Sequence, residues 1–232
     1  MSLITASGLC KTYQSGDITV EAIKDATFTI EPGSFVAFVG PSGSGKSTLL
    51  NMVGCLDTPS CGSLKVLDTD VSLLNQKEAA IFRGKNIGFV FQDFNLIPVL
   101  SAYENIEYPL MMVQDWPAEK RHTRVMELLD AVGMTDQAYK HPSQLSGGQK
   151  QRVAVARALV TQSKLVLADE PTANLDSITA HKVIDLMKEM REKFGTTFIF
   201  STHDTKVMAE AEITFTLVDG KIVNESKEGA HV

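Results

Sequence analysis

The fold is decided by one glycine-rich stretch, Gly40-Pro41-Ser42-Gly43-Ser44-Gly45-Lys46-Ser47-Thr48. An apolar segment that is predicted to form a buried strand precedes it, and residues 46–53 are predicted to continue as a helix. A glycine-rich turn between a strand and a helix is typical of a phosphate-binding loop, because backbone N–H groups at a helix N-terminus can surround phosphate oxygens. Lys46 is then expected to reach the β- and γ-phosphates, and the Ser47 hydroxyl to bind Mg²⁺.

The composition around this stretch is that of an ordinary folded domain. The chain has 232 residues, of which 44% are hydrophobic and 22% charged. A formal net charge of −6, with no long Lys/Arg run, argues against nucleic acid as a partner. No apolar run reaches the ~20 residues of a membrane helix, so we expect a cytoplasmic chain that meets a membrane only through a partner.

Cysteine usage gives a further expectation about the compartment. Cys10, Cys55 and Cys61 have neither the paired spacing of a metal site nor an even count. We therefore interpret all three as free thiols in a reducing compartment.

Strand and helix patterns alternate along most of the chain, which predicts an α/β fold with a mostly parallel, covered sheet. Residues 3–30 read as short antiparallel strands broken at Ser15-Gly16-Asp17, and Asp219-Gly220 suits a type I′ hairpin turn. Residues 93–160 read as almost wholly helical. We predict a single domain, in which residues 1–92 and 161–232 form the core and residues 93–160 form a helical subdomain.

Two carboxylates follow the apolar run 165–168, which is predicted to form a strand. Ligands bind at the carboxyl ends of strands in parallel sheets, so Asp169 is expected to hold Mg²⁺ opposite Ser47. Glu170 is the better candidate for polarising an attacking water, because a second buried acid is otherwise expensive. A solvated strand end is the alternative without function.

A second candidate anion site precedes the helix that runs through Arg152. Its residues are Ser146-Gly147-Gly148-Gln149, which place backbone donors at a helix N-terminus. A serine-glycine-glycine run alone is usually an ordinary loop. It gains weight here because the same chain already carries one phosphate loop.

In this order, the motifs closely resemble those of the ABC transporter ATPase family over essentially the whole chain. The resemblance implies roles for further positions, although single residues such as Tyr13 or His203 are more often ordinary strand or core residues. In that family an aromatic residue stacks on adenine, a glutamine loop links the metal site to the transmembrane partner, an Asn-Leu-Asp loop crosses to the second subunit, and a switch histidine contacts the γ-phosphate. These positions match Tyr13, Gln92, Asn174-Leu175-Asp176 and His203.

The resemblance also implies a mechanism with ATP and Mg²⁺ as cofactors. Two copies would face each other head to tail, with ATP clamped between the Lys46 loop of one copy and the Ser146 loop of the other. The implied catalytic residues are Glu170, His203, Gln92 and Lys46, and the implied Mg²⁺ ligands are Ser47, Gln92 and Asp169. The implied ATP-binding residues are Tyr13, Gly40 to Thr48, Ser146, Gly147, Gly148, Gln149 and Asp176. The motor would power a separate membrane permease from the cytoplasmic face of the inner or plasma membrane.

Within the family, the chain is similar to the branch of lipoprotein-releasing and macrolide-export ATPases. The matching segments are Gly88 to Gln92, Asn95-Leu96-Ile97-Pro98 and Glu104-Asn105. That branch pairs with permeases that carry a large extracytoplasmic domain, and the short tail after Asp219-Gly220 favours export or extraction over import. Lys150 and Ala173 depart from the residues most frequent in the family, which leaves the exact subfamily open.

Three alternatives follow from the same residues. Residues 94–100 form either a groove for a helix of the membrane partner or part of the helical core. The chain could instead be an ABC-type ATPase that acts on ribosomes or DNA, although it has one cassette and no sustained heptads. A permease-linked signalling or cell-division ATPase without transport is the third. The residues do not record the cargo.

Overall fold

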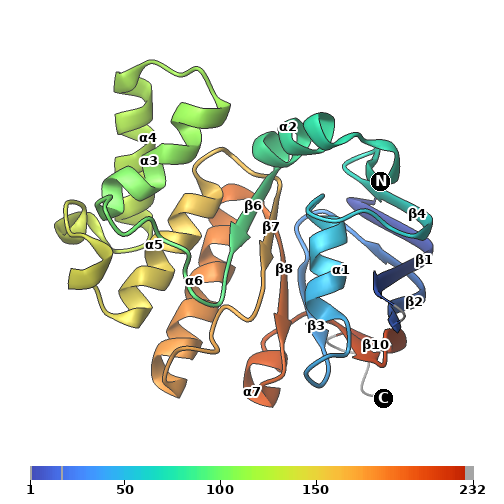
Figure 1. Ribbon diagram of the computed structural model, residues 1–232. Coiled ribbons are helices and arrows are strands. Elements are labelled where there is room, and N and C mark those ends of the chain that lie inside the picture. Colours follow the sequence, from blue (N-terminus) through green and yellow to red (C-terminus); the bar gives the residue numbers. More distant parts are fainter. Residues whose placement is uncertain (1, 17, 228–232) are drawn as a thin grey trace. The chain divides into compact units, whose positions relative to one another are not determined.

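The structure is a computed structural model that describes residues 2–16 and 18–227 (Figure 1). It divides into two compact units. The first contains the chain up to Ala80 and again from Ile199 onward, and the second contains Ile81–Phe198. The second unit includes residues 93–160 with strands and helices on either side, so the narrower helical subdomain stays a prediction.

The first unit contains a four-stranded antiparallel sheet with the order β2-β1-β4-β5. Its strands are β1 (Ile4–Ser15), β2 (Ile18–Ile30), β4 (Cys61–Val66) and β5 (Thr69–Asp70). The expectation of short strands is wrong for β1 and β2, which have 12 and 13 residues. Register shifts between Ala6 and Thr12 let β1 follow its partner without a break. The predicted break does separate β1 from β2, although Asp17 lies outside the described residues.

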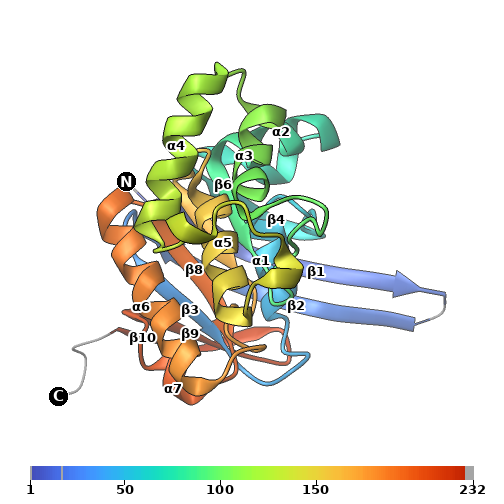
Figure 2. The same cartoon turned by 90° about the vertical axis from the view of Figure 1, so that its left-hand side faces the viewer.

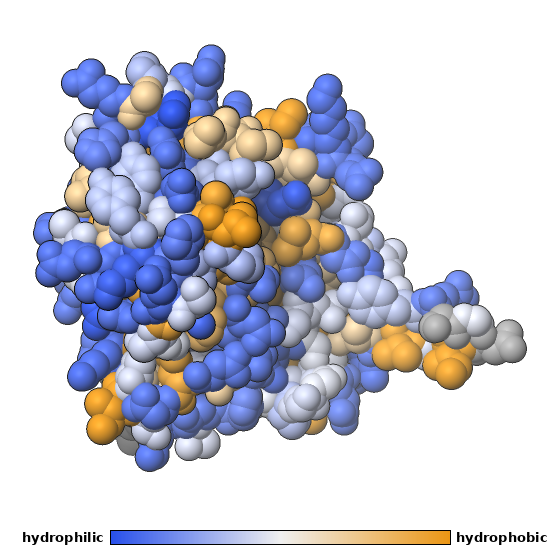
Figure 3. Space-filling view, turned by 60° about the vertical axis from the view of Figure 1, so that its left-hand side comes forward, coloured by the Kyte–Doolittle hydropathy of each residue, from blue (hydrophilic) through white to orange (hydrophobic). Residues whose placement is uncertain are grey.

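The far end of the β1–β2 hairpin extends beyond the rest of its sheet (Figure 2). Along β2, apolar side chains are buried from Ile23 to Ile30, whereas Ile18 and Val20 are 66% and 53% exposed. Figure 3 shows apolar side chains at this exposed end. One half of the hairpin is therefore packed into the core, and the other half exposes apolar side chains at its surface.

The first unit also holds strands in the order β10-β9-β3-β8. They are β3 (Phe35–Val39), β8 (Thr197–Thr202), β9 (Ile213–Val218) and β10 (Lys221–Lys227). The predicted hairpin turn is confirmed, since Asp219 and Gly220 both have positive φ, 48° and 81°. Phe38 packs against Phe28 and Phe215 at ring-centroid distances of 5.5 Å. Short helices complete the unit: α1 (Lys46–Val53), η1 (Val71–Leu73) and α7 (Thr205–Met208).

The second unit pairs β6 with β7 in parallel, with Val90 opposite Ala168. Gly88 on β6 lies so close to α5 that a Cβ would come within 2.0 Å of the Ala158 carbonyl oxygen. Only glycine fits this approach of helix and strand. The elements are β6 (Ile87–Val90), β7 (Leu165–Ala168), α3 (Ala102–Val113), α4 (Ala118–Ala131), η2 (Thr135–Gln137), η3 (Pro142–Gln144), α5 (Gly147–Leu159) and α6 (Ser177–Phe194). Helix α2 (Gln76–Asn86) and strand β8 each begin in one unit and end in the other.

These elements confirm the predicted α/β class, with an N-terminal antiparallel sheet beside parallel strands. Most other predicted elements are found, with α1 at its predicted bounds. The prediction that residues 93–160 are almost wholly helical is wrong for 93–101 and 114–117, and positive φ at Phe94 and Asn95 is incompatible with a right-handed helix. Across the described ranges, no helix is both long and apolar enough to span a membrane.

The prediction that all three cysteines are free thiols is wrong. Cys10 and Cys61 form a disulfide, and Cys55 is a buried thiol outside it. Strands β1 and β4 pair antiparallel and place Cys10 opposite Cys61. The odd count and wide spacing along the chain concealed this proximity, which only the strand pairing creates.

Candidate functional site

The predicted phosphate loop connects β3 to α1 and is held by its own lysine. Lys46 is only 5% exposed, and its Nζ donates hydrogen bonds to the carbonyl oxygens of Gly40 (2.9 Å) and Pro41 (3.0 Å). These bonds close the loop around the ammonium group. The loop is therefore formed in the protein as it stands, with a buried cation at its centre.

Two glycines of this loop have a steric reason to be glycine. Gly40 has φ +151°, and a Cβ there would lie 2.1 Å from the carbonyl oxygen of Leu217. Gly45 has φ +104°, and its Cβ would lie 2.5 Å from the carbonyl oxygen of Ala22. Both positions combine a left-handed backbone with close backbone contact, so no other residue is tolerated without a shift.

The N-terminus of α1 has polar groups that are suited to an anion. The N-cap residue is Gly45, and no side chain caps the first turn. Ser44 is 2% exposed, and its Oγ has no hydrogen-bond partner among the described residues. A helix N-terminus without a side-chain cap, beside a buried hydroxyl and a buried ammonium group, fits a phosphate.

Tyr13 lies on β1 and is held by charged neighbours. Its hydroxyl donates to Asp57 Oδ2 at 2.6 Å, and Lys11 Nζ lies 4.9 Å from the ring centroid. Partial burial, with added effect from Asp57, raises the pKa of Tyr13. Partial burial opposes ionisation of Asp57, but hydrogen bonds from Lys11 and Tyr13 hold its pKa below the usual value. The ring is 40% exposed and thus available for stacking.

His203 directly follows β8 and lines a cavity of about 330 Å³ in the same unit. The start of the phosphate loop forms another wall of this cavity. The lining residues are Val39, Gly40, Pro41, Thr202, His203, Asp204, Thr205, Met208 and Thr216. The first unit thus places His203 and the start of the phosphate loop around one cavity, while a contact of His203 with the γ-phosphate stays a prediction.

Gln92 and Asp169 follow the ends of the parallel strands β6 and β7 in the second unit. The backbone N–H of Asp169 donates to the carbonyl oxygen of Val90 at 2.9 Å, which fixes the two chain segments at the same sheet edge. Glu170 has φ 45°, a left-handed conformation that is uncommon for a residue with a side chain. Strained backbone of this kind is frequent at functional sites.

Two further side chains form hydrogen bonds to the segments that follow β6 and β7, and these contacts were not predicted from the sequence. Gln151 is fully buried in α5, and its Nε2 donates to the carbonyl oxygen of Pro171 at 2.7 Å. Asn174 Nδ2 donates to the Gln92 carbonyl (3.1 Å) and to Asp93 Oδ1 (2.8 Å). A glutamine on the face of α5 that also carries buried apolar residues was the available signal for the first. Nothing in the sequence indicated the second contact.

The predicted second anion loop begins α5 and is capped by its own side chains. Ser146 Oγ accepts from the Gln149 backbone N–H at 3.3 Å, and Gln149 Oε1 accepts from the Ser146 N–H at 2.9 Å. The two glycines fit close packing within the second unit. A Cβ on Gly147 would lie 3.2 Å from Leu175 Cδ2, and one on Gly148 would lie 2.5 Å from Thr179 Cγ2.

Asp176 is the N-cap of α6. Its Oδ1 accepts from the backbone N–H groups of Ile178 and Thr179, each at 3.1 Å. Hydrogen bonds from Thr179, first from its side chain and then from its backbone, lower the pKa of Asp176. The carboxylate therefore has a structural role whatever ligand it meets.

The residues predicted for Mg²⁺ have suitable chemistry. A serine hydroxyl, an amide oxygen and a carboxylate are the hard oxygen ligands that this ion takes alongside phosphate and water. Ser47 lies in the first unit, while Gln92 and Asp169 share one strand edge in the second. Among the described residues, no group of three or more His, Cys, Asp or Glu could form a metal site without further ligands. By the chemistry of their oxygen atoms, these side chains are suited to Mg²⁺ that also binds phosphate.

A formed glycine loop with a buried lysine, at a helix N-terminus with no side-chain cap, defines a P-loop nucleotide-binding protein. Comparison with known proteins specifies the family. The family model described as ABC transporter matches residues 23–173. The chain belongs to the ABC transporter family and is an ATPase of that family.

Two relatives and one solved structure show the extent of the similarity. The macrolide export ATP-binding/permease protein MacB of Brucella melitensis is 44% identical over 97% of this chain. This chain spans only 34% of that relative's length. The uncharacterized ABC transporter ATP-binding protein MJ0796 of Methanocaldococcus jannaschii is 42% identical, with 97% of both chains covered. A dimeric structure of the MJ0796 cassette in a post-hydrolysis state with ADP and Pi superimposes with a TM-score of 0.88, at 41% identity, and covers 97% of this chain and 98% of that one.

Proposed function

We propose that this ATPase works as a pair, drives a separate membrane permease, and belongs to the branch that exports or extracts cargo. The observation that carries ATP binding, on which the rest of the proposal depends, is the formed phosphate loop, in which buried Lys46 is held by the carbonyl groups of Gly40 and Pro41. A ligand-free anion cradle needs no large rearrangement to bind the phosphates of ATP. ATP with Mg²⁺ is the proposed cofactor.

In this proposal, the first unit binds the nucleotide. Tyr13 stacks on adenine, while residues 40–48 surround the phosphates. Lys46 exchanges its two carbonyl partners for β- and γ-phosphate oxygens, so that the buried charge is neutralised. Ser47 holds Mg²⁺ together with Asp169 and Gln92, and the ion neutralises charge on the phosphates when bound.

Hydrolysis is proposed to depend on the carboxylate of Glu170, which follows the end of β7. Glu170 accepts a proton from the attacking water as the oxygen forms its bond to the γ-phosphorus, and the bond to the ADP oxygen breaks. Gln92 and His203 orient the water and the γ-phosphate. The left-handed backbone of Glu170, φ 45°, is the kind of strain that is frequent at functional sites, which supports its role as proton acceptor.

The second copy completes the site. Ser146, Gly147, Gly148 and Gln149 of one copy would meet the γ-phosphate bound by the other, with Asp176 close to the same junction. The dimeric structure of the MJ0796 cassette with ADP and Pi supports the pairing of two copies. Dimerisation is then part of catalysis, since neither copy alone has a complete set of ligands.

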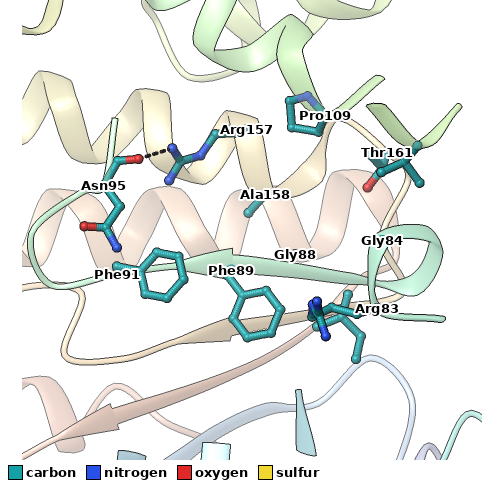
Figure 4. Close-up of a pocket in the computed structure, with 12 residues that line it drawn as sticks. Arg83, Gly84, Gly88, Phe89, Phe91, Asn95, Pro109, Arg157, Ala158 and Thr161 are labelled. Atoms are coloured by element: carbon teal, nitrogen blue, oxygen red, sulfur yellow. Dashed lines mark hydrogen bonds between the residues drawn. The ribbon is translucent and has the colours of Figure 1, made fainter. Parts of the chain in front are cut away.

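The permease is proposed to dock on the second unit. A cavity of about 280 Å³ there is lined by Phe89, Phe91, Pro109 and Val113, with the guanidinium of Arg157 at its edge (Figure 4). Arg157 donates to the carbonyl oxygens of Phe94 and Asn95 and so holds the chain that follows Gln92. Burial lowers the pKa of Arg157 to about 10, so the side chain stays charged at neutral pH. An apolar groove with a fixed cation suits an amphipathic helix.

The export branch and the position at the membrane rest on the relatives. Proteins named macrolide export ATP-binding/permease match at 40–44% identity, which supports export through a permease. By resemblance to that branch, we propose a permease with a large extracytoplasmic domain. We place the chain on the cytoplasmic face of the membrane, held there by that permease. The cargo would be recognised by the permease.

The first test uses Glu170→Gln, which removes the proton acceptor but keeps the shape of the side chain. The variant should bind ATP, lose hydrolysis by about 100-fold or more, and accumulate as a closed dimer with ATP. Light scattering after gel filtration reports the dimer. A monomer at saturating ATP would count against the paired mechanism.

The second test concerns the permease. Tagged Glu170→Gln protein is purified from native membranes in mild detergent with ATP, and its stoichiometric partners are identified by mass spectrometry. Val99→Asp lies in the segment 94–100, of which Asn95 lines the cavity, and it should lose the permease, whereas the matched variant Val223→Asp on β10 should keep it. Val99 and Val223 are 78% and 59% exposed, so neither change disturbs the core. An importer permease with many spans would contradict the export branch.

A further inference from the structure

The disulfide between Cys10 and Cys61 joins two strands beside Tyr13. The two residues are opposite each other in the β1–β4 register, with Cα atoms 5.0 Å apart. They are 51 positions apart in sequence, and the chain between them includes β2, β3 and the phosphate loop. The bond therefore closes a covalent loop around the nucleotide-binding part of the first unit.

Hydrogen bonds connect the same two segments from the disulfide towards Tyr13. The Ser60 N–H donates to the Cys10 carbonyl oxygen (2.9 Å), and Ser60 Oγ accepts from the Thr12 N–H (3.0 Å). Lys11 Nζ donates to the carbonyl oxygen of Thr58 (2.8 Å) and to the carboxylate of Asp57. Residues 57–61 and 10–13 thus form one continuous contact with the disulfide at one end.

Asp57 is the other end of this contact, and it positions Tyr13. Its Oδ2 accepts the Tyr13 hydroxyl at 2.6 Å, while its Oδ1 binds Lys11. The orientation of the ring therefore depends on where the 57–61 segment lies. A covalent bond at Cys61 restricts that segment.

The same geometry suits the reduced state. Cys10 Sγ lies 3.4 Å and Cys61 Sγ 3.9 Å from the carbonyl oxygen of Gly8. Either sulfur, once it carries a proton, can donate a weak hydrogen bond to that oxygen. Cys61 is exposed and Cys10 half-buried, so a small oxidant can reach the pair.

We propose that Cys10 and Cys61 are a reversible redox couple that regulates ATP affinity through Asp57 and Tyr13. This inference rests on the proposed role of Tyr13 as the adenine platform and on the proposed position at the cytoplasmic face, since protein disulfides in the cytosol are typically transient and redox-sensing. The oxidised form holds Asp57 and Tyr13 in place and binds ATP more tightly than the reduced form. We expect a ratio of roughly three- to tenfold, the scale of ordering one side chain.

The oxidant is a low-molecular-weight disulfide, RSSR. The exposed Cys61 thiolate attacks one sulfur, breaks the RS–SR bond and releases one thiol, which leaves a mixed disulfide on Cys61. The Cys10 thiolate then displaces the second thiol and forms the Cys10–Cys61 bond. Two electrons pass from the cysteine pair to RSSR, and the two cysteine protons end on the two released thiols.

The test equilibrates the full chain in buffers of oxidised and reduced glutathione and measures ATP affinity by calorimetry. Cys10→Ser should trap glutathione on Cys61, seen as added mass, whereas Cys61→Ser should not. The Cys10→Ser/Cys61→Ser double variant should bind ATP like the reduced form in every buffer. Cys55→Ala is the matched control and should keep the full response. Tyr13→Phe keeps the ring without the bond to Asp57 and should reduce the response.

The outcomes separate this inference from the proposed function. Equal ATP affinity of the oxidised and reduced forms, or a response that persists in the double variant, overturns the redox coupling while the ATPase function stands. A pair that glutathione buffers do not interconvert overturns reversibility. Absence of ATP binding by every form would overturn the proposed site and the inference with it.

Discussion

Helices α1 and α5 both begin with a glycine-rich turn, but their first turns are satisfied in different ways. At α1 the N-cap is Gly45, and no side chain caps the helix. At α5, Ser146 and Gln149 form a reciprocal pair of hydrogen bonds that satisfies two backbone donors. The backbone N–H groups at the start of α1 thus remain available to a ligand. At the start of α5, side chains already accept hydrogen bonds from two backbone N–H groups.

The glycines of the two turns differ in the same way. In the phosphate loop, Gly40 and Gly45 have positive φ and lie against backbone carbonyl oxygens. In α5, Gly147 leaves room for Leu175, which precedes α6, and Gly148 leaves room for Thr179 in the first turn of α6. The difference agrees with the proposed roles, in which α1 binds phosphate within one copy and α5 offers a rigid surface to a ligand bound by the other copy.

The largest expected effect is the difference between two lysine variants, one in the first turn of α1 and one in the first turn of α5. Lys46→Ala removes the buried cation and should lower ATP turnover by about 100-fold or more, with weaker ATP binding, since preorganised charges contribute on this scale. Lys150→Ala, in the first turn of α5, should leave ATP affinity within about twofold, because its Nζ lies 6.0 Å from the Phe94 ring centroid as a peripheral contact. Calorimetry and a phosphate-release assay measure both. Equal losses in the two variants would remove the distinction between the helices.

The next effect separates the cap of α5 from its proposed ligand. Ser146→Asp keeps a good N-cap and should leave the melting temperature nearly unchanged, but its negative charge should repel the γ-phosphate of the other copy. We expect ATP hydrolysis to fall about tenfold or more, and the ATP-dependent dimer to be lost in light scattering. Ser146→Ala is the control, and it should destabilise the fold by about 1 kcal/mol. A Ser146→Asp protein that dimerises normally would show that this turn does not meet phosphate.

A smaller effect tests the packing role of the α5 glycines. Gly148→Ala places a Cβ 2.5 Å from Thr179 Cγ2, and overpacking of this kind destabilises by about 1–3 kcal/mol. Thr179→Ser removes that methyl group and keeps the hydroxyl, so the double variant should recover part of the loss. Urea denaturation of the four proteins gives the coupling free energy. Strict additivity would contradict the contact.

The smallest effect concerns pH at the cap of α6. The folded-state pKa of Asp176 lies below its ordinary value of 3.8, so its contribution to stability is present above that value and is lost as pH falls through the folded pKa. The difference in melting temperature between the unmodified chain and Asp176→Asn should be constant from about pH 5 to 8 and should shrink below about pH 4. If the difference in melting temperature instead grew as the pH fell, the folded-state pKa of Asp176 would not be lowered.

The sequence predicted elements best where local signals agree. The phosphate loop lies between a buried strand and a helix, and α1 has its predicted bounds, Lys46–Val53. The family and the α/β class follow from such motifs in order. The hairpin turn at Asp219-Gly220 was predictable for the same reason, because the required backbone is a property of two adjacent residues.

The remaining features depend on contacts between distant segments. Asp57 meets Tyr13, 44 positions away, only because the segment leading into β4 runs beside β1. The Cys10–Cys61 bond has the same origin, and an odd cysteine count concealed it. The capping of α5 could have been read from Ser146 and Gln149 three residues apart, a spacing typical of capping boxes. The roles of the site residues stay predictions until the variants are measured.

The position of β3 between β9 and β8 has a consequence for synthesis of the chain. Both neighbours are translated long after the phosphate loop, with β9 beginning only at Ile213. At about 5–20 residues per second, β3 remains without either partner for on the order of ten seconds. During that time both of its edges and the apolar rings later covered by Phe215 are exposed on the ribosome. The nascent chain is therefore a substrate for chaperones, and translation that stops before Ile213 yields a fragment prone to aggregate.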